Sequence, residues 1–217
     1  MTMETTTTGP QAAPNPALVA GAGEAAITQE QQSRAAAYGL IAALLRSPPD
    51  QDLLGQVAGL SQVSGNGDDL SVAMSMLGLA ARSSALEAVD DEFHDLFIGL
   101  GRGELMPYAS WYLTGFLMER PLGLLRDDLA HLGIERDPSV VEPEDHMAAL
   151  CEVMLLLIRE QRGFEQQAAF FEQHLARWCD DFFADLSAAK SAAFYRNLGR
   201  FGSAFFQLER RYFSMQV

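Results

Sequence analysis

Apolar residues recur along most of the chain at steps of three and four, and this spacing predicts amphipathic helices. The clearest case follows Ser84, where Leu86, Val89, Phe93 and Leu96 fall on one helical face. Sustained alternation of apolar and polar positions with β-branched side chains, the pattern of half-buried strands, is not found in the sequence. The pattern therefore predicts an all-α protein.

Capping residues, prolines and glycines divide this pattern into about nine or ten helices of a single-domain bundle. Thr28 with Gln31 resembles a capping box, and Ser84 with Glu87 is a second candidate. Gly133 is a natural end for a helix. The predicted helices cover residues 36–45, 50–60, 70–81, the stretch that carries Leu86 to Phe97, a segment after Pro107, 122–132, 144–161, 164 to about 186, and about 191 to 212.

Residues 135–143, with Asp137-Pro138 among them, read as an exposed linker before the C-terminal helices. We expect a hinge there, which allows either a monomer or a domain-swapped dimer. The start of the chain is rich in Thr, Ala, Pro and Gly and has no sustained apolar stretch, so it does not read as a secretory signal. We therefore predict a disordered leader over residues 1–27 and an all-helical domain over 28–217.

The balance of charge restricts the kind of partner. The chain has 217 residues, 48% of them hydrophobic, and its 29 acidic against 15 basic residues give a formal net charge of -14. A field of that sign repels nucleic acid and anionic membranes and attracts basic ligands. No apolar run reaches the length of a membrane span. We expect a cytoplasmic protein without stable membrane insertion, with a cationic peptide as partner and no nucleic acid.

The sequence offers little catalytic chemistry. The four histidines form no Glu-x-x-His pair of the kind that a di-metal helical centre needs. Cys151 and Cys179 lie in apolar helical patterns and read as buried thiols, although a disulfide between them stays open. The loop at Gly99, Gly101 and Gly103 lacks the spacing and the lysine of nucleotide-binding loops. We expect no catalytic residue, no metal site and no cofactor.

An aromatic segment, Pro107 to Tyr112, is the first candidate for binding. Tyr108 and Trp111 combine an apolar ring with a polar group and suit a pocket. Tyr112 and Phe116 fit a buried core equally well at this stage.

The stretch Glu142-Pro143-Glu144-Asp145-His146 is the second candidate, and it reads as a helix start. Pro143 suits a first helical turn, because its missing N–H is one of the donors that a helix end leaves unpaired. Glu144 and Asp145 would then lie where the helix dipole favours negative charge. The same letters are also compatible with a binding surface, and spacing alone does not decide between the two interpretations.

These five residues resemble the E-P-x-D-H signature of the TorD/DmsD family of molybdoenzyme-specific chaperones. Three further segments fit the family in the same order, and together the similarity covers about residues 30 to 212. The segments are EFHDLFIG (92–99), PYASWYLTG (107–115) and FFEQHLARW (170–178).

The resemblance implies an all-helical, cytoplasmic, non-catalytic chaperone for redox-enzyme maturation. Such a protein binds the twin-arginine signal peptide of a molybdopterin-dependent oxidoreductase and holds the apoenzyme until its cofactor is inserted, before Tat export. A NarJ-like assembly factor for a membrane-bound molybdoenzyme is the alternative within the same superfamily. A helical metal-dependent enzyme is a less favoured alternative from another class.

The resemblance also implies a peptide site, formed by residues of the two motifs. We expect the carboxylates of Glu142, Glu144 and Asp145 to pair with arginines of the peptide, since guanidinium groups match carboxylates well. Aromatic side chains are expected to meet its apolar stretch, and His146 to orient its neighbours. The predicted site residues are Pro143, Asp145, His146, Pro107, Ser110 and Tyr112 from the resemblance, with Glu142 and Glu144 as carboxylates and Tyr108 and Trp111 added on chemical grounds.

Overall fold

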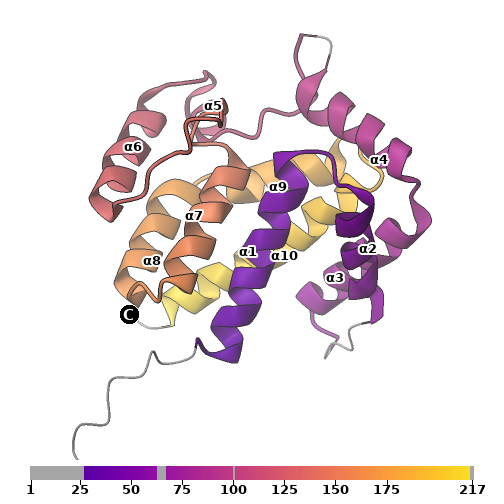
Figure 1. Ribbon diagram of the computed structural model, residues 1–217, viewed down its shortest axis with the longest axis horizontal. Helices are drawn as coiled ribbons and strands as arrows, with labels where there is room; N and C mark the ends of the chain where they lie inside the picture. Colours follow the sequence, from indigo (N-terminus) through magenta and orange to yellow (C-terminus); the bar gives the residue numbers. More distant parts are fainter. Residues whose placement is uncertain (1–26, 63–66, 100, 216–217) are drawn as a thin grey trace, which may run out of the picture.

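The computed structural model describes residues 27–62, 67–99 and 101–215, and in these ranges it confirms the predicted all-α fold (Figure 1). An isolated antiparallel bridge between Tyr108 and His146 is the one β-type pairing in the described ranges. The elements are α1 (Gln29–Arg46), α2 (Gln51–Gly59), the 3-10 turn η1 (Leu60–Gln62), α3 (Asp69–Ser83), α4 (Leu86–Phe93), the π-helical turn η2 (His94–Ile98), α5 (Ala109–Thr114), α6 (Arg120–Leu132), α7 (Met147–Arg159), α8 (Phe164–Phe170), the π-helical turn η3 (Phe171–Leu175), α9 (Cys179–Ala188) and α10 (Tyr195–Ser214).

Several predicted helix ends are confirmed. Thr28 caps α1, its hydroxyl oxygen accepting a hydrogen bond from the Gln31 backbone N–H at 3.2 Å. Gly133 ends α6 with a φ of 71°, in the left-handed region that favours glycine. Residues 134–143 contain no regular helix, as predicted for a linker, while the hinge itself stays a prediction. The predicted leader, apart from Ile27, lies outside the described residues.

Three predicted helix boundaries are wrong. The Ser84 capping box does not form, because Ser84 donates its hydroxyl back to the Ala80 carbonyl and so closes α3 instead of opening α4. The single helix expected from 164 to about 186 is divided by η3 and by a non-helical residue, Trp178, with φ of -147°. The last helix begins at Tyr195 rather than near 191.

The late start of α10 has a long-range cause. The carboxylate of Glu92 in α4 accepts hydrogen bonds from the backbone N–H groups of Ala193, Phe194 and Tyr195 at 2.6–2.9 Å. These are donors that the beginning of a helix leaves unpaired. A glutamate about a hundred residues upstream therefore caps α10, and no local pattern indicates this.

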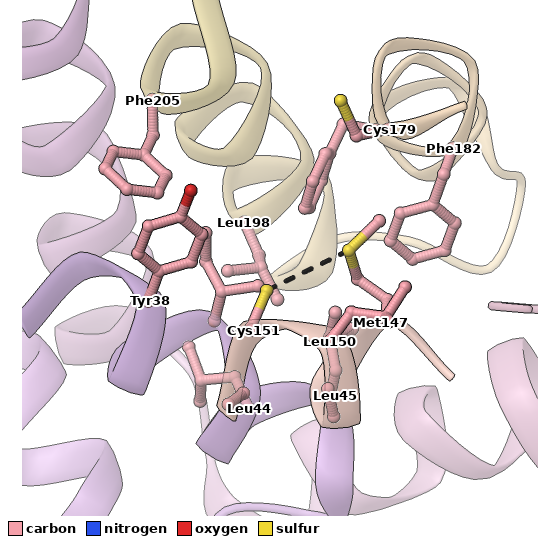
Figure 2. Packing of buried hydrophobic residues seen from close by; sticks show 14 of the residues in the cluster. Tyr38, Leu44, Leu45, Met147, Leu150, Cys151, Cys179, Phe182, Leu198 and Phe205 are labelled. Atoms are coloured by element: carbon pink, nitrogen blue, oxygen red, sulfur yellow. Dashed lines mark hydrogen bonds between the residues drawn. The ribbon is translucent and has the colours of Figure 1, made fainter. Parts of the chain in front are cut away.

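The core lies between α1, α7 and α10, with α9 packed along α10 (Figure 1). Figure 2 shows Tyr38 and Leu44 of α1, Cys151 of α7 and Phe205 of α10 converging there. Cys151 and Cys179 are free and buried, which agrees with the prediction of buried thiols. Burial raises the pKa of the Cys151 thiol far above its ordinary value, so this side chain acts as a small apolar group.

Close packing of α9 on α10 requires small residues. At Gly202 an added Cβ would lie 2.3 Å from the Phe183 ring, well inside contact distance. Even a methyl group at this position would force the Phe183 ring or one of the two helices to shift. Gly202, which has no side chain, therefore allows α9 and α10 to pack closely.

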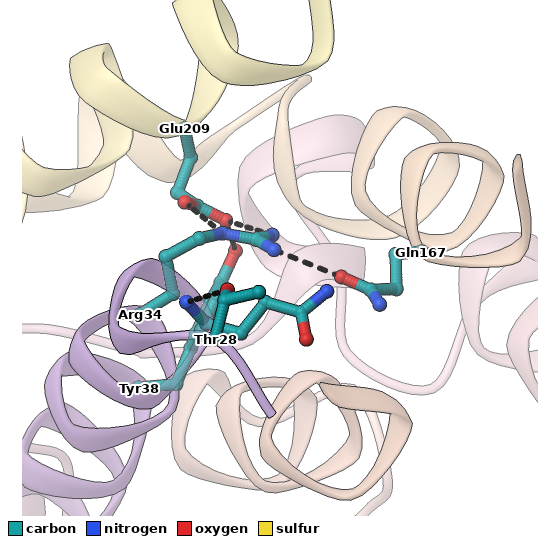
Figure 3. A network of polar contacts seen from close by, with 6 residues as sticks. Thr28, Arg34, Tyr38, Gln167 and Glu209 are labelled. Atoms are coloured by element: carbon teal, nitrogen blue, oxygen red, sulfur yellow. Dashed lines mark hydrogen bonds and ion pairs between the residues drawn. The ribbon is translucent and has the colours of Figure 1, made fainter. Parts of the chain in front are cut away.

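A buried polar network joins the first and last helices of the fold (Figure 3). Arg34 of α1 donates from Nε and Nη2 to the two carboxylate oxygens of Glu209 of α10, both at 2.7 Å. The hydroxyl of Tyr38 donates to the same carboxylate at 2.8 Å, and Arg34 Nη1 donates to Gln167 at 3.0 Å. The guanidinium also stacks over the ring of Tyr212, at 3.9 Å from its centroid.

Candidate functional site

The two candidate segments, 35 residues apart in sequence, lie side by side in the structure. The bridge between Tyr108 and His146 is made by two backbone hydrogen bonds: Ala109 N–H donates to the Asp145 carbonyl at 3.0 Å, and Met147 N–H donates to the Pro107 carbonyl at 2.8 Å. The start of α5 is thereby fixed against the start of α7. Pro107, Tyr108 and Ser110 are brought together with Asp145 and His146.

The carboxylate of Asp145 is buried, with 1% of the residue exposed. One oxygen, Oδ2, accepts a hydrogen bond from the backbone N–H of Ser110 at 2.8 Å. The other, Oδ1, has no hydrogen-bond partner among the described residues, and the same is true of the Ser110 hydroxyl. A buried carboxyl oxygen without a hydrogen-bond partner is costly, so this arrangement favours an additional donor at the site.

The prediction that Glu144 and Asp145 form the first turn of their own helix is wrong. The helix α7 begins at Met147, and Glu144 and Asp145 lie in a turn before it. Asp145 still lies at a helix N-terminus, but that helix is α5, where it contacts the second residue. The prediction of a carboxylate at a helix N-terminus was therefore correct for Asp145, but the helix is α5 and not the helix that follows Asp145 in sequence.

Asp145 is among the residues that line a groove with a volume of about 360 Å³ between α5, α6, α7 and η3. We call this cavity the groove. Its walls are largely apolar and include Leu113, Leu124, Leu125 and Leu150. Two basic and one imidazole side chain also line it: Arg120, Arg177 and His174. His174 bonds through Nε2 to Asp128 of α6 at 2.8 Å, which joins η3 to α6.

His146 caps α7 instead of lying within its first turn. Its Nδ1 accepts a hydrogen bond from the Ala148 N–H at 3.1 Å, which fixes Nδ1 as the unprotonated nitrogen. The ring packs edge-on against Tyr108, with centroids 5.1 Å apart. Burial, with a smaller effect from the charge of Arg46, lowers the pKa of His146 to about 3. The imidazole is therefore neutral at ordinary pH, and its predicted role in orienting neighbours stays a prediction.

The pKa of His146 predicts how stability depends on pH. The unfolded chain binds a proton on this histidine below its ordinary pKa of 6.5, whereas the folded chain does so only near pH 3. The stability that the neutral ring contributes is thus present above pH 6.5 and lost as the pH falls towards about 3. His146→Asn keeps a capping acceptor and removes this titration. We expect it to reduce the acid-side loss by up to about 1.4 kcal/mol per pH unit.

Urea unfolding of both proteins at about pH 7 and about pH 5 measures this difference. His94→Asn serves as the control, because His94 is exposed and also near an aspartate. Equal losses of stability in wild type and His146→Asn between the two pH values would contradict the assignment of a neutral, buried ring.

Glu142, the first residue of the second motif, contacts Tyr108 of the first. The Tyr108 hydroxyl donates to the Glu142 carboxylate. Burial raises the pKa of Tyr108, and the hydrogen bond to Glu142 raises it further, so the phenol stays protonated. Tyr108 therefore contacts the second motif through its ring and its hydroxyl, while its neighbours Pro107 and Ala109 make the backbone hydrogen bonds across the bridge.

Glu144 forms ion pairs with two arginines that are not among the predicted site residues. Arg126 of α6 donates from Nε at 3.0 Å and from Nη2 at 2.8 Å to Oε2, and Arg136 Nε lies 3.7 Å from Oε1. Burial alone would raise the pKa of Glu144, but the hydrogen bonds and charge of Arg126 outweigh it and the pKa is lowered. No sequence-local signal indicates this contact, since Arg126 is 18 residues upstream in a different helix.

Trp111 and Tyr112 face other neighbours than the five-residue motif. Trp111 lies beneath the guanidinium of Arg102, at 4.6 Å from the ring centroid. Tyr112 donates its hydroxyl to Asp185 at 3.0 Å and packs against Trp178. Burial and the Asp185 charge raise its pKa. Phe116, for which a core position was open, is 68% exposed.

Metal ligation and membrane insertion are the two remaining properties of the described part of the chain. It contains no group of three or more His, Cys, Asp or Glu residues that could hold a metal ion. None of its single helices is long and apolar enough to cross a membrane, and only α3 taken together with Leu86–Ile98, a pair bent by 114°, passes that test by length and composition.

Comparison with known proteins gives consistent results. The family model described as nitrate reductase delta subunit matches residues 66–184. The chain is 27% identical to the chaperone protein TorD of Vibrio atlanticus (strain LGP32) over 146 residues, which is 62% of this chain and 68% of that protein. It is 26% identical to TorD of Vibrio cholerae serotype O1 (strain ATCC 39541) over 166 residues, or 68% of this chain and 76% of that protein.

A solved structure shares the fold. It is described as that of a redox enzyme maturation protein from Archaeoglobus fulgidus, and it superposes with a TM-score of 0.53 at 16% identity. The alignment covers 83% of this chain and 94% of the other. At this identity the match establishes the helical architecture alone.

Proposed function

The chain belongs to the nitrate reductase delta subunit family, and we propose that it binds the twin-arginine signal peptide of a molybdopterin-dependent oxidoreductase. The names of its family and relatives identify a chaperone rather than an enzyme, of the kind that matures redox enzymes. In this proposal the chaperone works in the cytoplasm, holds the apoenzyme until its cofactor is inserted, and releases it for Tat export.

The observation that carries the proposal is the state of Asp145. Asp145 lines a largely apolar groove, and its carboxylate has one oxygen bonded to Ser110 N–H and the other without a partner in the described part of the chain. A guanidinium group supplies the donors that this oxygen lacks, and charge-assisted hydrogen bonds of this type are strong. We therefore expect an arginine of the peptide to contact Asp145 where this residue lines the groove.

The rest of the groove suits the apolar stretch of a signal peptide. Leu113, Leu124, Leu125 and Leu150 supply walls against which an apolar helix can pack. Arg120 and Arg177, which also line the groove, disfavour a cationic segment along most of its length. In this proposal the arginines of the peptide lie near Asp145 and its apolar residues lie along the leucines.

The remaining predicted residues would act around this contact. Glu142 and Glu144, partly exposed, offer further carboxylates beside Asp145. His146 and Pro107 would hold the two motifs in register, and Tyr108 would fix Glu142. Trp111 and Tyr112 lie farther along α5, where they would meet a later part of the peptide.

A synthetic peptide with adjacent arginines followed by an apolar stretch tests the proposal by calorimetry. We expect it to bind, and we expect a lysine-lysine version to bind about tenfold more weakly, since lysine lacks the planar fork. Raising the salt concentration from about 0.05 M to about 0.5 M should weaken both, because the acidic field is screened. Equal affinity for the two peptides would refute recognition of paired arginines.

The name of the matching family model supports a second candidate, assembly of a membrane-bound nitrate-reductase-type enzyme in the manner of NarJ. The relatives at 26–27% identity are TorD chaperones, and they favour the first candidate. Capture of the partner from the native cell separates the two. A partner with a twin-arginine leader supports the first candidate, and a catalytic subunit without one supports the second.

A further inference from the structure

The carboxylate of Glu144 is occupied by two arginines of the chain itself. Arg126 reaches it from α6 and Arg136 from the linker that precedes the motif, at 2.8 Å and 3.7 Å respectively. Arg136 Nη1 also donates to the Glu142 carbonyl at 3.3 Å. Two guanidinium groups thus gather around one carboxylate that is next to Asp145 in sequence. We call Arg126 and Arg136 the arginine pair.

The exposure of these groups indicates a contact that can open. The Glu144 side chain is 13% exposed, while those of Arg126 and Arg136 are 53% and 39% exposed. Both guanidinium groups can rotate away from Glu144 and be hydrated instead. Exposed ion pairs contribute little free energy, so this rotation costs little. The Glu144 side chain, by contrast, is largely shielded from water, so its carboxylate needs a hydrogen-bond donor from the protein or a ligand.

The arginine pair also lines two cavities. Both arginines line a cavity of about 460 Å³ beside Pro143 and a second one of about 220 Å³ beside Glu144. Apolar side chains stand in each, Leu122 and Val141 in the first and Leu129 in the second. Rotation of the two arginines would join these cavities along α6 and leave Glu144 at their boundary.

We propose that the arginine pair is an internal competitor of the twin arginines of the peptide, and that binding displaces it from Glu144. This inference rests on the proposed function and concerns the regulation of that same site. In the free protein the pair neutralises Glu144 and ties α6 to the linker. A ligand with two adjacent guanidiniums replaces both contacts at once, whereas a ligand with one cation replaces only one. The pair therefore raises selectivity for adjacent arginines and lowers absolute affinity.

The double variant Arg126→Gln/Arg136→Gln tests the proposal, with the same synthetic arginine-arginine peptide as probe. We expect it to bind about two- to thirtyfold more tightly than wild type, the range that follows from the loss of two partly exposed competing ion pairs. The charge-matched control is Arg82→Gln/Arg200→Gln, which removes two exposed arginines of α3 and α10. It lowers the net charge equally and measures the effect of the general field.

A gain in affinity does not arise from misfolding, so the outcomes can be distinguished. Adding Glu144→Gln to Arg126→Gln/Arg136→Gln should abolish the gain, because the competed carboxylate is then absent. If wild type does not bind the peptide, the proposed function fails and this inference with it. If wild type binds and Arg126→Gln/Arg136→Gln binds no more tightly than the control, the competitor is refuted while the peptide site stands.

Discussion

Replacing Glu209 with glutamine is expected to lower the free energy of unfolding by about 3–5 kcal/mol, because it leaves a buried arginine without its counter-ion. Arg34 is 4% exposed and Glu209 is fully buried, and their two parallel hydrogen bonds are both 2.7 Å long. Glutamine offers one acceptor where the carboxylate offers two, and the charge of Arg34 is no longer balanced. Chemical denaturation monitored by circular dichroism measures the loss.

A second substitution should restore part of this stability. Arg34→Met removes the unbalanced charge, and an apolar side chain of similar length can fill the space. Tyr38 keeps an acceptor in Glu209→Gln, so its hydroxyl does not become an orphan. We therefore expect the double variant Arg34→Met/Glu209→Gln to be more stable than Glu209→Gln alone.

The partly exposed pair of Arg46 and Glu152 is the matched control. Glu152→Gln is expected to cost less than about 1 kcal/mol, since solvent can replace the lost partner. The assignment fails if Glu209→Gln costs no more than Glu152→Gln, or if removal of Arg34 from Glu209→Gln destabilises the protein further.

Asp145→Asn is expected to weaken binding of the arginine-arginine peptide about tenfold to a hundredfold, the range for loss of a hydrogen bond to a charged group in a buried site. Asparagine keeps an oxygen that can accept from Ser110 N–H, so the cap on α5 survives. What is lost is the negative charge of a residue that lines the groove. Calorimetry measures the affinity, and an unfolding curve recorded in parallel reports on the fold.

Asp52→Asn is the control for this prediction, since Asp52 is exposed in the first turn of α2, an element that does not line the groove. It makes the same chemical change to an exposed aspartate and should leave affinity within about twofold of wild type, because exposed charges at a distance are screened. If Asp145→Asn folds normally and binds as wild type does, the peptide does not use this carboxylate.

The sequence allowed most of the helices to be predicted, because their signals are local. Apolar spacing identified the buried face of α4, and Thr28 and Gly133 identified the ends of α1 and α6. The failures share a physical cause, which is that a helix can be capped by a residue remote in sequence. Glu92 caps α10 and Asp145 contacts the start of α5, and neither partner can be paired by spacing rules.

The candidate site was likewise predictable in its parts and not in its arrangement. The two motifs could be recognised one by one, but the backbone bridge that brings Tyr108 against His146 depends on tertiary structure. The same holds for Arg126, which looks like any exposed arginine of an amphipathic helix until α6 is placed beside Glu144. Peptide recognition by these residues stays a prediction that the experiments above decide.

The distance in sequence between Arg34 and Glu209, 175 positions, has a consequence for how the protein is made. At about 5–20 residues per second, the ribosome adds Glu209 roughly 9 to 35 seconds after Arg34. During that interval α1 carries a guanidinium with no counter-ion, and water must solvate it. Burial of α1 is therefore favourable only once α10 has been made, so a product truncated before α10 should remain open and be recognised by cellular proteases.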